Sequence, residues 1–215
     1  MRVHLVRWYD LPHLGDLMSR RFLFVLGSAR AEGNTELLAR RAAEQLPDDV
    51  GQRWIDLSGQ PLPDFEDLRH DSDHVRPPSD TPLGLLLDAT LEATDIVIAS
   101  PVYWYSVSAQ TKRYLDHWSG WLRIPGLDFK ARMAGRTLWG VAALAHEELS
   151  VADPYAGTLR YSAAYMGMRF GGVLLGNGSK PGDVLNDTGA LTRAKTFFAQ
   201  DAPLARFPYE TADAA

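Results

Sequence analysis

Short apolar runs alternate along this chain with longer stretches in which apolar residues recur at helical spacing. An unbroken apolar run of this length is typical of a strand buried on both faces of a sheet. The predicted strands are Arg21–Gly27, Arg53–Leu57, Asp95–Ser100, Thr137–Leu144 and Arg169–Leu175. The predicted helices are Asn34–Leu46, Pro82–Ala93, Val107–Leu122, Pro154–Met166 and Asp187–Ala199.

Buried strands that alternate with amphipathic helices predict an α/β fold, with a five-stranded parallel sheet and helices on both faces. We expect this domain to span residues 21–201, with an N-terminal extension over 1–20 and a C-terminal tail over 202–215. In a doubly wound sheet, ligands bind at the carboxyl ends of the strands. The chemistry is therefore expected in the loops after the first, third and fourth strands.

Composition narrows the classes of function. The net charge of -5 gives no attraction to nucleic acid or to an anionic membrane, and no apolar run is long enough to cross a bilayer. The chain has no cysteine, which excludes a thiolate nucleophile and a cysteine-ligated iron–sulfur cluster. Redox chemistry would need an organic cofactor or a metal held by other ligands. The first twenty residues lack the apolar stretch of a secretory signal, so a cytoplasmic protein is expected.

The segment from His70 to His74 is the one place that suggests a metal site. It lies in an irregular acidic stretch, without a second cluster to complete a coordination shell. We interpret it as a solvated loop and predict no metal.

A polar loop bounded by glycines follows the first strand, and it reads Gly27-Ser28-Ala29-Arg30-Ala31-Glu32-Gly33-Asn34-Thr35. Free N–H groups at the start of a helix attract anions. Ser28, Asn34 and Thr35 add side-chain donors, and Arg30 adds positive charge. The loop lacks the lysine of a nucleotide-binding P-loop and the glycine spacing of a dinucleotide fold, so it suits a phosphate monoester. The alternative is a plain turn, with Asn34 as the helix N-cap and Gly33 relieving strain.

An aromatic loop follows the third strand, where Tyr103, Trp104 and Tyr105 come directly after Pro101 and Val102. Aromatic side chains and backbone N–H groups at the end of a buried strand can hold a flat heteroaromatic ring. The alternative is that these side chains pack beneath the next helix.

Together the two loops resemble the NADPH-dependent FMN reductase family of flavodoxin-like proteins, over about residues 21–176. The matching segments are Gly27-Ser28-x-Arg30-x-x-Gly33-Asn34-Thr35, Ser100-Pro101-Val102-Tyr103-Trp104, Lys112-x-x-x-Asp116 and Asp56-Leu57…Pro61-Leu62-Pro63. The resemblance implies a flavodoxin-like three-layer sandwich, seen in that family as a homodimer or homotetramer. It places the FMN phosphate on Ser28, Arg30, Asn34 and Thr35. It places the flavin ring and ribityl chain against Pro101, Val102, Tyr103 and Trp104, and we add Tyr105 as a candidate contact.

The loop after the fourth strand departs from the family pattern of a polar or glycine-rich turn. It reads Ala142-Ala143-Leu144-Ala145-His146-Glu147-Glu148. His146 is a candidate contact to flavin or substrate, and the alternative is a surface histidine at a helix start.

The resemblance implies an FMN-dependent NAD(P)H oxidoreductase. Hydride would pass from NAD(P)H through flavin N5 to a small acceptor such as a quinone, a flavin, an azo compound or a nitro compound. No catalytic side chain is expected, because the flavin carries the redox chemistry. The alternatives are a flavodoxin-like electron carrier and a non-enzymatic FMN-binding module.

Overall fold

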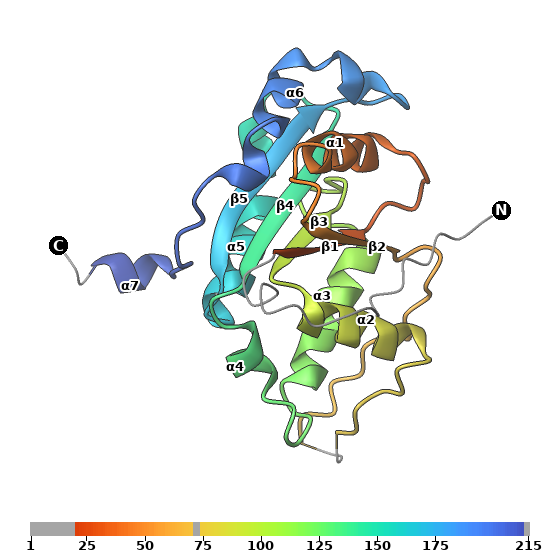
Figure 1. Ribbon diagram of the computed structural model, residues 1–215, viewed down its shortest axis with the longest axis vertical. Coiled ribbons are helices and arrows are strands. Elements are labelled where there is room, and N and C mark those ends of the chain that lie inside the picture. The colour runs from red at the N-terminus through yellow and green to blue at the C-terminus, as the bar shows by residue number, and fades with distance from the viewer. Residues whose placement is uncertain (1–19, 71–73, 213–215) are drawn as a thin grey trace.

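The computed structural model describes residues 20–70 and 74–212, and its centre is one parallel sheet (Figure 1). The strands are β1 (Arg21–Leu26), β2 (Gly51–Asp56), β3 (Asp95–Ala99), β4 (Thr137–Leu144) and β5 (Arg169–Asn177), in the order β2-β1-β3-β4-β5. Every neighbouring pair is parallel. The predicted five-stranded parallel sheet of an α/β fold is therefore confirmed.

Helices cover both faces of the sheet and complete the three layers. The major helices are α1 (Asn34–Ala43), α2 (Pro82–Glu92), α3 (Ala109–Trp121), α5 (Asp153–Tyr165) and α6 (Thr188–Ala194). Successive side chains of a strand point to opposite faces, so β1 supplies Leu23 and Val25 to the core beneath α2, α3 and α5. Phe22 and Phe24 enter the core beneath α1 and α6.

The predicted helix over 187–199 differs most from the structure. Helix α6 ends at Ala194, and a 3-10 helix, η3 (Phe197–Ala199), follows it. This break turns Phe197 and Phe198 inward, where both rings contact Trp139. The other short elements are α4 (Phe129–Met133), η1 (Leu149–Ala152), η2 (Asp183–Asn186) and α7 (Pro208–Ala212). Elements of about one turn have no periodicity to reveal them in the sequence.

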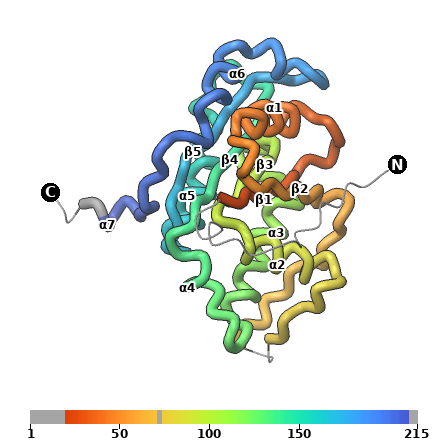
Figure 2. The backbone as a smooth tube through the Cα atoms, in the orientation of Figure 1, coloured from red at the N-terminus to blue at the C-terminus, as the bar shows by residue number. Residues whose placement is uncertain are grey.

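Two irregular segments lie along the sheet's margins. Between β2 and α2, residues 57–70 and 74–81 run past α3 (Figure 2). At the opposite margin, the segment after η3 lies beside β5, where Phe170 N donates to Pro203 O (2.9 Å) and Ala205 N to Met168 O (2.9 Å). The start of the predicted C-terminal tail is thus attached to the edge strand.

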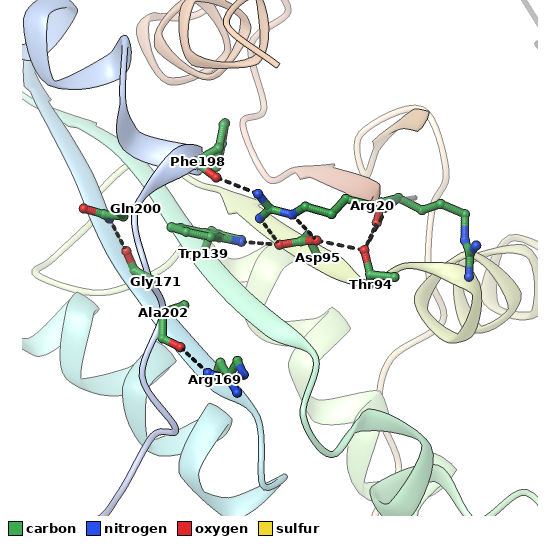
Figure 3. A network of polar contacts seen from close by, with 10 residues as sticks. Arg20, Thr94, Asp95, Trp139, Arg169, Gly171, Phe198, Gln200 and Ala202 are labelled. Atoms are coloured by element: carbon green, nitrogen blue, oxygen red, sulfur yellow. Dashed lines mark hydrogen bonds and ion pairs between the residues drawn. The ribbon is translucent and has the colours of Figure 1, made fainter. Parts of the chain in front are cut away.

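A buried polar network joins the starts of the strands (Figure 3). The Asp95 carboxylate, at the start of β3, accepts from Arg20 Nε (3.1 Å), Trp139 Nε1 (2.9 Å) and Thr94 Oγ1 (2.8 Å). Arg20 also donates to Phe198 O (2.7 Å). The Asp95 carboxylate therefore links β3 and β4 to Arg20, just before β1, and Arg20 extends the network to η3. The network lies at the edge of the sheet opposite the strand ends that carry the predicted site.

Candidate functional site

The loops after β1, β3 and β4 meet at the carboxyl edge of the sheet, as the sequence predicts. Gly27 N donates to Ala99 O (2.9 Å), and Val102 N donates to Ala143 O (3.3 Å). Ala143 N in turn donates to the Thr35 hydroxyl (3.1 Å). The starts of the loops after β1 and β3 and the start of α1 are thus bonded to the neighbouring strands β3 and β4, which fixes their relative positions.

Gly27 allows the start of α3 to approach the end of β1. A Cβ at Gly27 would lie 1.8 Å from Thr111 Oγ1, an overlap that no side chain could accommodate without movement. The same closeness lets Ser108 Oγ donate to Gly27 O (2.6 Å) while it caps α3 through Thr111 N. The contact of β1 with α3 therefore depends on the absence of a side chain at residue 27.

The loop after β1 leads directly into the start of α1. Its N-cap is Gly33, at φ -72°, and no side chain caps the helix. The alternative in which Asn34 is the N-cap is therefore wrong, because Asn34 is the first residue inside the helix. Ser28 Oγ accepts from Arg30 N (3.1 Å) and donates to Arg30 O (2.9 Å), which folds the loop back on itself. Within the described residues, the exposed Arg30 guanidinium has no hydrogen bond or ion pair.

The side chains of Asn34 and Thr35 are hydrogen-bonded to residues outside the loop after β1. The Asn34 side chain donates to Lys180 O (2.8 Å) and accepts from Val184 N (3.4 Å), and Thr35 is 3% exposed. Both side chains hold the neighbouring loops against the start of α1. Nothing in the sequence indicated that the segment after β5 belongs to this region. The Asn34 side chain holds that segment, which includes the exposed Lys180, beside the loop after β1.

Glu36 fixes the far side of the first loop. Its carboxylate accepts from Glu32 N (2.8 Å), and Glu32 lies at φ 54°, a conformation that glycine would adopt more readily. Arg40 donates twice to the same carboxylate (2.9 and 2.6 Å). This ion pair offsets a negative charge that would otherwise oppose an anion at the start of α1.

The aromatic loop forms a tight, exposed turn. Tyr103 N donates to Ser106 O (3.0 Å) and Ser106 N to Tyr103 O (3.1 Å). Trp104 and Tyr105 occupy the two central positions, at φ 49° and 66°. The three aromatic residues are between 51% and 93% exposed, so the alternative in which they pack beneath the next helix is wrong.

His146 lies in the exposed turn after β4. Its Nδ1 accepts from Glu148 N (3.1 Å), and its carbonyl accepts from Asn177 Nδ2 (2.8 Å). The imidazole thus stabilises its own turn, and its Nε2 faces no partner among the described residues.

A groove of about 300 Å³ lies at the other end of α3 from this site. Its walls include Phe65, Leu83, His117 and Trp121. His117 is 7% exposed, and its Nε2 lies 2.9 Å from Pro63 O, which anchors the irregular segment between β2 and α2. Burial lowers the pKa of His117 from its ordinary value of 6.5, so the neutral ring donates to Pro63 O.

We expect the lowered pKa of His117 to make the protein less stable in mild acid. The unfolded chain binds a proton on this histidine near pH 6.5, whereas the folded chain does so only at lower pH. Stability is therefore fully present above pH 6.5 and falls as the pH falls below it. Urea denaturation at pH 7.5 and 5.5 should show a smaller loss for His117→Gln than for the wild type. Equal losses of stability in the two proteins would contradict a lowered pKa for His117.

Comparison with known proteins identifies the family. The family model for NADPH-dependent FMN reductase matches residues 20–168. YwqN of Bacillus subtilis, whose name describes an NAD(P)H-dependent FMN-containing oxidoreductase, is 32% identical over 78% of this chain and 91% of its own. The iron-sulfur flavoprotein MJ1083 of Methanocaldococcus jannaschii is 29% identical over 80% of this chain and 90% of its own. The structure of the Trp repressor binding protein from Bacillus subtilis superposes with a TM-score of 0.65, at 25% identity, over 84% of this chain and 99% of that one.

The chain belongs to the NADPH-dependent FMN reductase family. It is an NAD(P)H-dependent FMN oxidoreductase with the flavodoxin-like fold, as the resemblance implies. The sequence has no cysteine, so it offers no thiolate ligand for an iron–sulfur cluster. Within residues 20–70 and 74–212, no three side chains are grouped to hold a metal ion, and no helix is long and apolar enough to span a membrane.

Proposed function

We propose that the carboxyl edge of the sheet holds FMN, and that the protein uses it to transfer reducing equivalents from NAD(P)H to a small acceptor. The single observation that carries this proposal is the start of α1, which no side chain caps and which follows the loop that carries Arg30. Among the described residues the Arg30 guanidinium has no ion pair, and Gly27 O of the same loop accepts from Ser108 Oγ, just after the aromatic turn. This arrangement suits a ligand with a terminal phosphate at one end and a flat ring at the other.

The phosphate would lie at the start of α1. Ser28 and Arg30 would contact it directly, together with the N–H groups of the first turn. Asn34 and Thr35 would act by holding that turn, because their side chains are already bonded to Lys180 O, Val184 N and Ala143 N.

The flavin ring would lie along the loop from Pro101 to Tyr105. Two N–H groups of this loop, those of Val102 and Tyr103, already donate to Ala143 O and Ser106 O. The N–H groups of Trp104 and Tyr105 have no acceptor among the described residues, so these two are available to a polar ring edge. His146, in the exposed turn after β4, is the candidate contact at the outer edge of the ring.

When bound, FMN would supply the redox chemistry, with its N5 as the site of hydride transfer. The protein then needs only to orient the cofactor and leave one face open to both substrates. Trp104 and Tyr105 are exposed at this position, which is consistent with an open site for a quinone, flavin, azo or nitro acceptor. We further propose a homodimer or homotetramer acting in the cytoplasm, which size-exclusion chromatography with light scattering and cell fractionation would test.

An anaerobic spectrum tests the function directly. The purified protein, loaded with FMN, should show flavin absorbance that bleaches within seconds of NADH or NADPH addition and returns when an acceptor is added. Bound FMN that neither nicotinamide reduces would indicate an electron carrier instead. A protein that takes up no FMN would refute the proposed site.

We expect Arg30→Ala to weaken FMN binding about tenfold, because one exposed charge-assisted contact to phosphate contributes about 1.4 kcal/mol. The matched control is Arg41→Ala. Arg41 is an exposed arginine in the last turn of α1, and it forms an ion pair with Glu44. Quenching of FMN fluorescence measures both dissociation constants. Equal constants for the two variants would remove Arg30 from the site.

A further inference from the structure

The segment between β5 and α6 lies beside α1 and brings an exposed lysine to the start of that helix (Figure 1). Asn34, the first residue of α1, donates from its side chain to Lys180 O (2.8 Å) and accepts from Val184 N (3.4 Å). A Cβ at Gly178 would lie 2.8 Å from the Asn34 amide nitrogen, so the absence of a side chain there permits this close approach. The backbone of Lys180 is thus attached to the turn that would receive the phosphate.

Both backbone groups of Lys180 are bonded, whereas its charged end is not. The Asp183 carboxylate accepts from Lys180 N (2.6 Å) and from Ser179 N (3.2 Å), and Asp183 N donates to Lys180 O (3.1 Å). Pro181 follows, and a residue before proline is biased toward an extended backbone. Within the described residues, the exposed Lys180 ammonium has no hydrogen bond or ion pair. The fold therefore fixes the base of this side chain and leaves its charge available to a ligand.

The phosphate of FMN calls for more positive charge than the loop after β1 supplies. A phosphate monoester carries a charge of about -1.5 to -2 near pH 7. The start of a helix contributes the equivalent of about +0.5, and Arg30 contributes a single positive charge. Arg40 adds nothing further, because its guanidinium is paired with Glu36. These contributions fall short of the fully ionised phosphate, so a second cation beside the loop would complete the balance.

We propose that the Lys180 ammonium is this second cation, and that it favours FMN over flavins that lack a phosphate. The inference rests on the proposed function, because it assumes a phosphate at the start of α1. Lysine carries a point charge on a long flexible stem, so it can reach a phosphate from a backbone fixed beside the loop. Lys180 lies beyond residues 20–168, which the family model matches, so the match to the family does not supply this residue. Asn34 acts as a positioning residue, since it holds the backbone of Lys180.

Binding of two flavins that differ only in the phosphate tests this proposal. Fluorescence quenching gives the dissociation constants of FMN and riboflavin for the flavin-free wild type, Lys180→Met, Lys180→Arg and Lys195→Met. Lys195 is the matched control, because it is an exposed lysine at the far end of α6. We expect Lys180→Met to weaken FMN binding about fivefold and to leave riboflavin binding unchanged. Lys180→Arg should restore most of the affinity, and Lys195→Met should change neither constant.

Two further measurements separate a contact with the phosphate from a structural role. The effect of Lys180→Met on FMN binding should shrink in about 1 M salt, where the Debye length is only about 3 Å. Asn34→Ala releases the backbone of Lys180 from the start of α1. Adding Lys180→Met to Asn34→Ala should therefore weaken FMN binding less than Lys180→Met weakens it in the wild type.

Equal losses of affinity for FMN and riboflavin would overturn the proposal in favour of a role in folding, which a lowered unfolding temperature of Lys180→Met would show. Unchanged FMN binding would remove Lys180 from the phosphate site. If KM for NADPH then rose while KM for NADH did not, the lysine would belong to the 2′-phosphate of the nicotinamide instead. Wild-type protein that binds riboflavin as tightly as FMN would refute the phosphate site of the proposed function before any variant is compared.

Discussion

Asp95→Ala is expected to lower the free energy of unfolding by about 3 kcal/mol. The Asp95 side chain is 3% exposed and accepts hydrogen bonds from three other residues, Arg20, Trp139 and Thr94. Its removal leaves the buried Trp139 Nε1 without an acceptor. Arg20 is 39% exposed, so water can solvate its charge once the carboxylate is removed. The loss of stability is therefore expected at the lower end of the range for a broken buried ion pair.

The control for this prediction is Asp67→Ala, which breaks an aspartate–arginine pair whose two side chains are both about half exposed. We expect a change within about 0.5 kcal/mol there. Asp95→Asn should fall between the two, because its amide oxygen can still accept from Trp139. Urea denaturation with FMN held constant measures all three. A loss below about 1 kcal/mol for Asp95→Ala would show that the network contributes little to stability.

The sheet was predictable because a strand buried on both faces leaves a clear signature. Phe22 to Leu26 and Ile96 to Ala99 are unbroken apolar runs, and both are buried strands in the central sheet. The Asp95 network was not predictable. Two of its three partners, Arg20 and Trp139, lie 75 and 44 residues away along the chain, and only the fold brings them to the carboxylate.

The candidate site was predictable in part for the same reason. The loops after β1 and β3 follow recognisable strands, so their place at one edge of the sheet could be inferred. The contacts of Asn34 and Thr35 could not be predicted, because each side chain is bonded to a residue more than 100 positions away along the chain. The left-handed backbone at Trp104 and Tyr105 also left no signal, since the sequence lacks the glycine or asparagine that marks such a turn.

Gly27 connects the stability of the fold with the proposed phosphate site. It joins β1 to the start of α3 and begins the loop that carries Ser28 and Arg30. Any Cβ there would overlap Thr111 Oγ1, at 1.8 Å, and would touch Ser108 Oγ at 3.0 Å. Relief requires α3 or the first loop to move, and either movement disturbs the proposed phosphate site.

We therefore expect Gly27→Ala to lower the free energy of unfolding by about 3 kcal/mol, as overpacking of a close backbone contact does. FMN binding should weaken about tenfold in the fraction that remains folded. Gly59→Ala is the matched control, because its added Cβ would meet only Asp56 O, at 3.7 Å, and its stability should change by less than about 0.5 kcal/mol.

A second substitution separates the overlap from any other effect of the methyl group. Thr111→Ala removes the oxygen that the new Cβ would strike, although Thr111 Cβ stays 3.2 Å away. The double variant Gly27→Ala/Thr111→Ala should therefore be more stable than Gly27→Ala alone, and it should bind FMN more tightly. Urea denaturation and fluorescence titration of the four proteins complete a double-mutant cycle. Strictly additive losses would mean that the two residues do not interact, and that the approach of α3 to β1 has another cause.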